Sequence, residues 1–260
     1  MELRDEIILF RQPESSHLGD CPICCLPHPI VRSKAVMNGC CGKLICASCH
    51  YSNEMRQADR SLAKVCPFCR HPLPSSEEEA RELLMKRAEA NDVASLVEVG
   101  YHYNSTGDFD AAFKYWAKAA ELGGDAEAHF CLATMYQHGK GGVEKDTEKE
   151  IHHLEKAAIA GHPNARFNLG CTDQAAGRTD MAVKHFIIAA NLGHETSLKF
   201  LQKFYSDGKV SKEDFAATLR VNQSTMEAAK SRQKKKREAE SASAVEVSKV
   251  AADKKVGHED

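Results

Sequence analysis

The chain has 260 residues, of which 42% are hydrophobic and 28% are charged, and its formal net charge is −2. These values predict soluble globular domains and exclude an overall basic surface of the kind that attracts nucleic acid. The apolar run at residues 7–10 is too short for a signal-peptide core or a membrane span, and no later stretch is long enough to cross a bilayer. We therefore expect a cytoplasmic or nuclear protein with no membrane partner.

The first two segments of the chain differ sharply in composition. Residues 1–18 show no hydrophobic periodicity, and we expect a flexible leader there. Residues 19–74 are rich in Cys, Pro and Gly, and only residues 51–63 carry a helical pattern. Nine of the eleven cysteines lie between Cys21 and Cys69. Because thiols stay reduced in the cytosol and nucleus, this clustering indicates metal ligands rather than disulfides.

Eight of these cysteines form a regular series. Three C-x2-C pairs and one doublet occur in the order Cys21 and Cys24, Cys40 and Cys41, Cys46 and Cys49, Cys66 and Cys69. Two thiolates separated by two residues can reach one ion at a tetrahedral angle, and eight thiolates serve two Zn²⁺ ions. The gap from Cys49 to Cys66 is within the range typical of zinc sites. The series predicts a module that binds two zinc ions.

The phrases CPIC, CCGKLICASC and CPFCR resemble a RING finger. The resemblance implies interleaved ligands, with the first zinc bound by Cys21, Cys24, Cys46 and Cys49. The second zinc would be bound by Cys40, Cys41, Cys66 and Cys69. RING fingers commonly have a histidine ligand where this chain has Lys43, so we expect Cys40 to supply the missing ligand. His50, Cys25 and His28 remain alternatives for that position.

The same resemblance implies a function. Most RING fingers are ubiquitin ligases, which hold a ubiquitin-charged conjugating enzyme and contribute no nucleophile of their own. Ile23 and Pro67 match the positions that contact the conjugating enzyme, and Arg70 matches the basic residue that bridges that enzyme and ubiquitin. The aromatic residue usual between the sixth and seventh ligands is missing, since residues 50–65 offer only Tyr51 and Met55. A non-catalytic adaptor that depends on zinc and only binds proteins is the alternative.

A repeated helical pattern follows the cysteine module. Residues 75–91 are expected to form a connecting helix, capped by Ser75 or Ser76 after two prolines. The phrases AAELG, AAIAG and AANLG then recur at intervals of 38 and 32 residues, and Trp116, Leu154 and Phe186 occupy equivalent positions before them. Self-similarity at this period predicts an α-solenoid of helix pairs over residues 92–230, with three clear repeats and a degenerate fourth.

Residues 136–165 resemble a Sel-one-like repeat, a close relative of the tetratricopeptide repeat. They read YQHGKGGVEKDTEKEIHHLEKAAIAGHPNA, which contains the Y-x-x-G-x-G-V-x-x-D turn and the closing A-A-x-x-G of that family. The resemblance implies that the repeats bind a protein, and exposed first-helix positions are candidates for contacts: His102, His129 and Arg166. We interpret residues 140–147 as a turn rather than a phosphate loop, because no strand precedes them.

The remaining histidines and cysteines of the repeats have structural interpretations. His152 and His153 are expected on the surface, because adjacent helical residues point in different directions. His162 and His194 are expected in equivalent turns between repeats, where their role is structural. Cys131 and Cys171 are expected to be small core residues of the repeat helices.

The last segment is basic and then polar. Residues 230–237, KSRQKKKR, are a candidate nuclear localisation signal or a contact for an acidic partner, and residues 231–260 as a whole are expected to be a basic run and a disordered tail. Taken together, the chain is expected to be mainly α-helical, with a small two-zinc RING-like module at 19–74 followed by an α-solenoid. The predicted function is a ubiquitin ligase whose partners are a conjugating enzyme, ubiquitin and a protein substrate held by the repeats.

Overall fold

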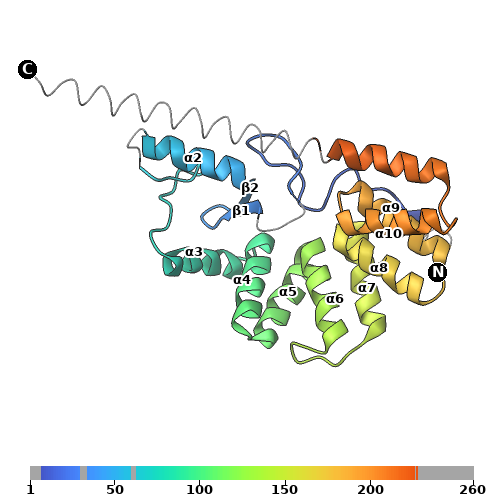
Figure 1. Ribbon diagram of the computed structural model, residues 1–260. Coiled ribbons are helices and arrows are strands. Elements are labelled where there is room, and N and C mark those ends of the chain that lie inside the picture. The colour runs from blue at the N-terminus through green and yellow to red at the C-terminus, as the bar shows by residue number, and fades with distance from the viewer. Residues whose placement is uncertain (1–6, 30–33, 60–62, 226, 228–260) are drawn as a thin grey trace, which may run out of the picture.

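A computed structural model describes residues 7–29, 34–59, 63–225 and 227, and Figure 1 shows its arrangement. The described part of the chain is mainly helical, as expected. The cysteine module lies at one end, and the helices that follow it form a curved stack. Among the described residues, no helix has both the length and the hydropathy needed to cross a membrane. The basic run at 230–237 and the tail to residue 260 lie outside the described residues.

The cysteine module is built on one short hairpin and one helix. Strands β1 (Ala35–Asn38) and β2 (Lys43–Cys46) are antiparallel, with Ala35 opposite Cys46. Asn38 Nδ2 donates a hydrogen bond to the Lys43 carbonyl at 3.1 Å and closes the turn between the strands. Helix α2 (Ala47–Asp59) begins directly after β2, four residues earlier than the predicted start at residue 51. The strand therefore leads into the helix without a loop, and Cys49 lies in the first helical turn.

Helix α3 (Glu77–Glu89) connects the module to the repeats and lies within the range predicted for it. Its first turn is capped reciprocally. The Ser76 hydroxyl accepts a hydrogen bond from the Glu79 backbone N–H at 3.1 Å, and the Glu79 carboxylate accepts one from the Ser75 N–H at 2.8 Å. This capping box explains why the helix begins where the acidic run begins.

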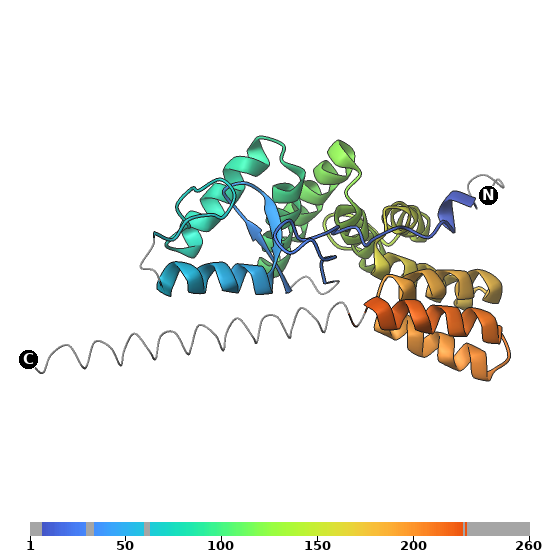
Figure 2. The same ribbon diagram turned by 90° about the horizontal axis from the view of Figure 1, so that it is seen from above.

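The repeats form a solenoid of paired helices, which confirms the predicted architecture. The helices are α4 (Val93–Thr106), α5 (Phe109–Gly123), α6 (Ala126–His138), α7 (Thr147–Ile159), α8 (Pro163–Ala175), α9 (Thr179–Asn191) and α10 (Glu195–Ser206). Residues 212–225 are also helical. Each helix packs most closely on its neighbours in the chain, and Figures 1 and 2 show the resulting arc from two directions.

Most helices of the solenoid begin at a capping side chain. Four aspartates take this role, at the starts of α4, α5, α6 and α7: Asp92, Asp108, Asp125 and Asp146. His162 and His194 do the same for α8 and α10, where each Nδ1 accepts a backbone N–H three residues later. The prediction that these two histidines are structural turn residues is confirmed. The predicted turn at 140–147 is also present, with Gly141 and Gly142 at positive φ.

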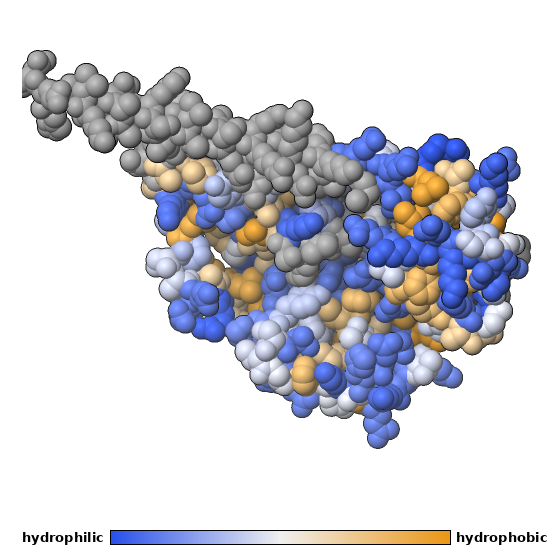
Figure 3. Space-filling view, viewed as in Figure 1, coloured by the Kyte–Doolittle hydropathy of each residue, from blue (hydrophilic) through white to orange (hydrophobic). Residues whose placement is uncertain are grey.

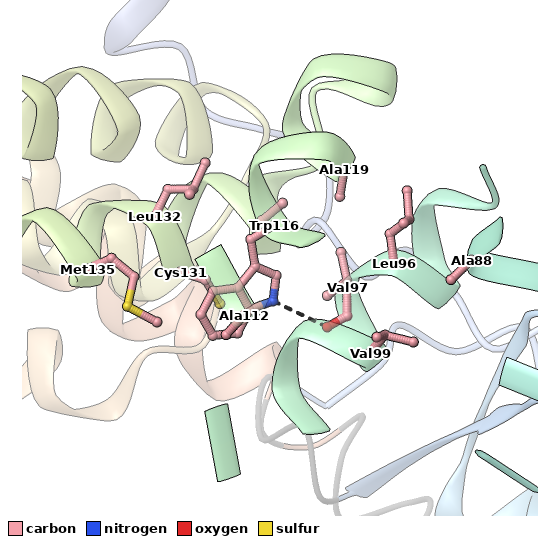
Figure 4. Packing of buried hydrophobic residues seen from close by; sticks show 11 residues of the cluster. Ala88, Leu96, Val97, Val99, Ala112, Trp116, Ala119, Cys131, Leu132 and Met135 are labelled. Carbon is pink, nitrogen blue, oxygen red and sulfur yellow. Dashed lines mark hydrogen bonds between the residues drawn. The ribbon is translucent and has the colours of Figure 1, made fainter. Parts of the chain in front are cut away.

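The core of the repeats contains the three side chains that the sequence placed in one column. Trp116, Leu154 and Phe186 are each at most 2% exposed. Figure 4 shows Trp116 packed between α4 and α6, with its indole N–H donating to the Val97 carbonyl at 3.2 Å. Cys131 and Cys171 pack in the same clusters, as predicted. The face drawn in Figure 3 is largely hydrophilic, with apolar residues in several separate patches.

The structure differs from the flexible leader expected for residues 1–18. Leu9 is 5% exposed and packs in a cluster formed by α6, α7 and α8. His17 contacts Glu127 on α6. Figure 2 shows this dark blue segment running along the repeat helices toward the N-terminus. The described residues 7–18 are therefore part of the packed structure of the repeats.

Candidate metal centre

The first group of four cysteines combines a knuckle turn with the junction between β2 and α2. Asp20 and Pro27 form an isolated bridge, and the Cys21 N–H donates to the Leu26 carbonyl at 2.8 Å. This turn holds Cys21 and Cys24 on the same side. Cys46 ends β2 and Cys49 lies in the first turn of α2. The four sulfurs lie within 4.8 Å of one another: Cys21, Cys24, Cys46 and Cys49.

The second group repeats this construction with the β1–β2 turn in place of the strand–helix junction. Val65 and Pro72 form the matching bridge, and the Cys66 N–H donates to the His71 carbonyl at 2.8 Å. The doublet lies in the turn between the strands. Its sulfurs approach the second knuckle, with Cys40 Sγ 3.4 Å from Cys69 Sγ and Cys41 Sγ 3.7 Å from Cys66 Sγ. All four lie within 4.8 Å of one another: Cys40, Cys41, Cys66 and Cys69.

The spacing of the sulfurs fits a tetrahedral metal ion. A Zn–S bond of about 2.3 Å separates two tetrahedral ligands by roughly 3.8 Å. The Sγ–Sγ distances of 3.4, 3.7 and 3.9 Å within the two groups are close to this value. All eleven cysteines are free thiols, so none of these contacts is a disulfide. The groups also interleave along the chain, with the first and third pairs in one and the second and fourth in the other.

The alternatives to Cys40 lie elsewhere. His50 is on α2 with its Nε2 3.6 Å from a carboxylate oxygen of Glu54. Cys25 is exposed and has φ +53°, the left-handed position that closes the first knuckle. His28 is buried, and its backbone N–H donates to the Gly19 carbonyl. Among the described residues, the two groups of four potential ligands consist of cysteines alone, and they include none of these three residues.

The electrostatics of both groups favour a bound cation. Burial opposes ionisation of the fully buried Cys21, but hydrogen bonds from backbone N–H groups, chiefly that of Cys46, lower its pKa to about 7. Burial and neighbouring thiols raise the pKa of Cys40 and of Cys49. Four thiolates this close repel one another unless a cation offsets their charge, and soft sulfur donors in a tetrahedron suit Zn²⁺. The residues present therefore fit zinc.

The three side chains predicted to contact other proteins lie on the two knuckles. Ile23 is 44% exposed in the first knuckle. Arg70 is exposed and occupies the same left-handed position in the second knuckle, at φ +59°, that Cys25 occupies in the first. Pro67 is partly exposed beside Cys66. On α2, Tyr51 and Met55 are partly exposed, whereas Gln57 is buried and donates to the Val65 carbonyl at 2.9 Å.

The turn of the doublet also rests on helix α3, which the sequence gave no reason to expect. Gly42 has φ +68°, and a side chain there would place Cβ 2.6 Å from Arg87 Nη2. Arg87 in turn pairs with Asp92 at 2.5 Å, and Asp92 caps α4. The second group of cysteines is thus linked through α3 to the first repeat.

A third cluster of potential ligands was missed at the sequence level. His17, Glu127 and His162 place one nitrogen or oxygen each within 4.8 Å of one another. However, His162 Nδ1 accepts the Ala165 backbone N–H, so the neutral ring carries its proton on Nε2 and points it toward Glu127. That nitrogen has no lone pair for a metal. The cluster is therefore better described as a hydrogen-bonded carboxylate, and its residues are separated too widely in the sequence to show a motif.

Two interpretations of repeat residues need correction. Arg166 was a candidate for an exposed partner contact, but it is fully buried. His153 was expected on the surface, yet it is partly buried, with its Nδ1 2.9 Å from His129 Nδ1. Burial and the neighbouring His129 lower the pKa of His153 to about 4. Only His152 of that pair is exposed.

The fold defines a helical-repeat protein, and comparison with known proteins specifies the repeat. The family model of the Sel1 repeat matches residues 93–124, 126–162 and 163–194, so these three units are Sel1 repeats. Chitin synthase regulatory factor 4 of Schizosaccharomyces pombe is 31% identical over 87 residues, which are 34% of this chain and 14% of that protein.

Two solved structures are similar to the repeat region of this chain. A Sel1 repeat protein from Oxalobacter formigenes matches with a TM-score of 0.50 and 23% identity, covering 64% of this chain and 52% of that one. The antigen c5321 of uropathogenic Escherichia coli, which has an SLR fold, matches with a TM-score of 0.48 and 24% identity, covering 58% and 35%. At 23% identity, the likeness to the Oxalobacter formigenes protein concerns the fold alone. The chain spans about half or less of the length of each of these relatives.

Proposed function

We propose that this chain is a RING-type ubiquitin ligase. The cysteine module would bind two zinc ions and hold a ubiquitin-charged conjugating enzyme, while the Sel1 repeats bind the protein to be modified. The observation that carries the proposal is the interleaving of the two cysteine groups, because it matches the crossed ligand order of RING fingers. The exposure of Ile23 and Arg70 on equivalent knuckles supports it further.

The module would act by positioning. It would hold the ubiquitin thioester of the conjugating enzyme in a reactive geometry near a substrate lysine, which accelerates transfer without a covalent intermediate on this chain. Ile23 and Pro67 would provide an apolar contact to the conjugating enzyme. Arg70 would donate hydrogen bonds from its planar guanidinium to carbonyl groups of both enzyme and ubiquitin.

The role of zinc would be structural. The buried residues of the module are few, with Cys21, Ile45 and Cys46 forming its core. So small a core cannot offset the entropy of ordering the chain, whereas structural zinc contributes on the order of 10–16 kcal/mol of apparent binding free energy in small fingers. The eight cysteines would hold the two ions, and the ions would hold the knuckles that present Ile23 and Arg70.

A non-catalytic adaptor is the second candidate. Among the described residues of α2, Tyr51 is the one aromatic side chain that could help to form a groove for a conjugating enzyme, and it directly follows the His after Cys49. The yeast relative is named as a regulatory factor, which favours partner binding by the repeats over catalysis. In this case the zinc module would bind a protein without stimulating ubiquitin transfer.

Autoubiquitination with a broad panel of conjugating enzymes separates the two functions. We expect activity that falls at least tenfold in Ile23→Ala and in Arg70→Ala, with two zinc ions still bound per chain. Lys64→Ala is the matched control, because the Lys64 side chain is exposed in the same module but is not one of the residues proposed to contact the conjugating enzyme or ubiquitin. A chain that binds two zinc ions and is inactive with every enzyme in the panel would be an adaptor.

A further inference from the structure

The leader segment lies against side chains from α6, α7, α8 and α9 of successive repeats. Leu9 packs in a cluster with Leu154, Ala165 and Leu169. The centroids of the Phe10 and His185 rings are 4.6 Å apart. The Lys184 ammonium lies 5.0 Å from the centroid of the Phe10 ring. An apolar pair near the start of the segment is therefore bound by repeat residues that come much later in the chain.

Polar groups of the repeats bind the main chain of the leader as well as its side chains. The guanidinium of Arg166 is buried and donates to the Leu9 carbonyl. At the other end, the His17 N–H donates to the Gly161 carbonyl at 3.1 Å. Between them, Asn191 Nδ2 donates to Gln12 Oε1 at 3.1 Å. Contacts to the main chain depend little on sequence, so these groups are suited to bind other segments with the same backbone course.

Gly161 lets the leader approach closely. It has φ +86°, and a Cβ there would lie 2.9 Å from the Ser15 carbonyl oxygen. A side chain would therefore push the leader away from the turn before α8. The backbone of this turn is shaped to let another strand of chain pass.

A partly buried carboxylate provides the main charged contact. Glu127 lies 2.8 Å from His17 Nε2 and also accepts a hydrogen bond from the Tyr101 hydroxyl. Burial opposes its ionisation, but hydrogen bonds from His162 and His17 lower its pKa well below the ordinary value. The His17 ring stacks on His162 at 4.3 Å between centroids. This site selects an imidazole, or a basic group that can donate to the carboxylate, at one position of the bound segment.

The polar fit of the leader is nevertheless incomplete. Apart from His162 Nε2, which faces Glu127 at 3.4 Å, nine buried side-chain atoms of the described residues have no hydrogen-bond partner, and six of these belong to the leader or to the repeat residues around it. They include Arg166 Nε and Nη2 and Asn191 Oδ1. Unmet buried polar groups cost free energy, so another segment that satisfies them can compete with the leader.

We propose that the leader site, formed by Glu127, Gly161, Arg166, His185 and Asn191, is a peptide-binding site of the Sel1 repeats that leader residues 9–17 occupy in cis. Its partner is a protein segment that begins in a helical turn, like leader residues 7–9, with a leucine-like residue whose carbonyl meets Arg166, and that carries a histidine or basic residue for Glu127 about eight residues later. The proposal rests on the repeats binding proteins and not on ligase activity. A partner must displace the leader, which its tether keeps at an effective concentration in the millimolar range.

Fluorescence anisotropy with a labelled peptide of residues 7–18 tests the proposal on the full chain. We expect the double variant Leu9→Ala/His17→Ala to bind this peptide at least tenfold more tightly than the wild-type chain, because its own leader no longer competes. A scrambled peptide is the control for unspecific binding. Circular dichroism and the fluorescence of Trp116 establish that the variant is folded.

A milder variant covers the case in which Leu9→Ala/His17→Ala does not fold. Phe10→Ala/Gln12→Ala removes one partly exposed and one exposed leader side chain, and we expect about threefold tighter peptide binding. If folded variants bind the peptide no more tightly than the wild-type chain, the leader is a fixed part of the fold and the proposal is wrong.

A double-mutant cycle then locates the peptide on the site. In the opened variant, Glu127→Gln should weaken binding of the leader peptide about tenfold. The same substitution should have little effect on a peptide in which the residue corresponding to His17 is replaced by alanine. If Glu127→Gln weakened the binding of both peptides equally, Glu127 would not contact the position of His17 in the bound peptide. Because all these readouts are binding constants, an inactive ligase module would leave them unchanged.

Discussion

At the scale of single residues, the cysteine doublet owes its geometry to the turn that carries it. The Cys41 and Gly42 N–H groups both donate to the Asn38 carbonyl, at 3.1 and 2.8 Å, so the chain turns tightly after β1. The positive φ of Gly42 completes that turn. Adjacent side chains on a strand would point in opposite directions. On this turn, both sulfurs of the doublet reach the second knuckle instead.

Zinc content tests the assignment of the doublet. We expect the wild-type chain to bind two zinc ions and Cys40→Ser to retain one, because three thiolates with a hydroxyl hold zinc poorly. Cys25→Ser is the matched control, since Cys25 is the exposed neighbour of a ligand pair, and it should retain both ions. Metal analysis of the purified variants gives the stoichiometry. If Cys40→Ser retained two zinc ions and His50→Ala retained one, the fourth ligand of the second zinc ion would be His50 rather than Cys40.

His185 provides a pH-dependent prediction in the repeats. Burial, together with the nearby charges of Arg166 and Lys184, lowers the pKa of His185 to about 3. The unfolded chain takes up this proton near the ordinary imidazole pKa of about 6.5. Its contribution to stability is therefore fully present above about pH 6.5 and is lost as the pH falls toward 3, by up to about 1.4 kcal/mol per pH unit.

His185→Asn should accordingly lose less stability on acidification. Between about pH 7 and pH 5, its free energy of unfolding should fall by up to roughly 2 kcal/mol less than that of the wild-type chain. Urea denaturation followed by circular dichroism at both pH values measures the difference. His138→Asn, on the exposed surface of α6, controls for the change in composition. An equal fall in wild type and His185→Asn would show that His185 does not contribute to acid sensitivity.

At the scale of elements, two of the helix pairs, α4–α5 and α8–α9, depend on a glycine opposite a large aromatic ring. A Cβ on Gly100 of α4 would lie 2.6 Å from Trp116 Cδ1, and one on Gly170 of α8 would lie 2.6 Å from Phe186 Cε1. Neither glycine has a positive φ. They are retained in helices despite their low helix propensity because the aromatic rings of α5 and α9 occupy the space that a side chain would need.

Gly100→Ala should therefore destabilise the repeats. Overpacking against a rigid indole costs about 1–3 kcal/mol, which meets or exceeds the gain of roughly 1 kcal/mol in helix propensity. We expect a net loss of up to about 2 kcal/mol in the free energy of unfolding, measured by urea denaturation with Trp116 fluorescence. Ser105→Ala, at an exposed position of the same helix, should change stability by less than about 0.5 kcal/mol. A more stable Gly100→Ala would mean that the helices can separate without cost.

The elements that could be predicted are those with a local cause. The period of apolar residues predicts the helix pairs, and aspartates or histidines before them match the observed caps. The leader could not be predicted in the same way. The hydrogen bond from Arg166 to Leu9 joins residues 157 positions apart and uses a main-chain carbonyl, which leaves no trace in side-chain pattern. For the same reason Arg166, a charged residue on a helix, appeared exposed at the sequence level.

The cysteine groups show a different limit. Local spacing identifies the C-x2-C pairs, because two residues between ligands suit one ion. It does not determine which pairs share an ion, since that depends on how the knuckles fold together. The resemblance to RING fingers supplied the pairing of Cys21 with Cys46 and of Cys41 with Cys66, and the structure brings the same sulfurs together. The metal itself remains a prediction.

At the scale of the whole molecule, the two parts of the chain differ in what holds them together. The repeats have three clusters of buried apolar side chains, whereas the cysteine module has one small cluster in which two of the three buried residues are cysteines. The contact between Gly42 and Arg87 and the pair Arg87–Asp92 connect the two parts. A paired surface charge of this kind contributes little free energy. We therefore expect the repeats to fold without the support of the module.

Metal removal tests this independence, because Trp116 is the only tryptophan of the chain and lies in the first repeat. A strong zinc chelator should remove both ions and unfold the module, which would lower the helical circular dichroism by the share of α2. The emission of Trp116 should stay at the short wavelength of a buried indole, and added zinc should restore the lost signal. A shift of that emission to longer wavelength on chelation would contradict the expectation. It would mean that the doublet turn stabilises α3 and α4 through Arg87 and Asp92, so that zinc occupancy is coupled to the partner-binding repeats.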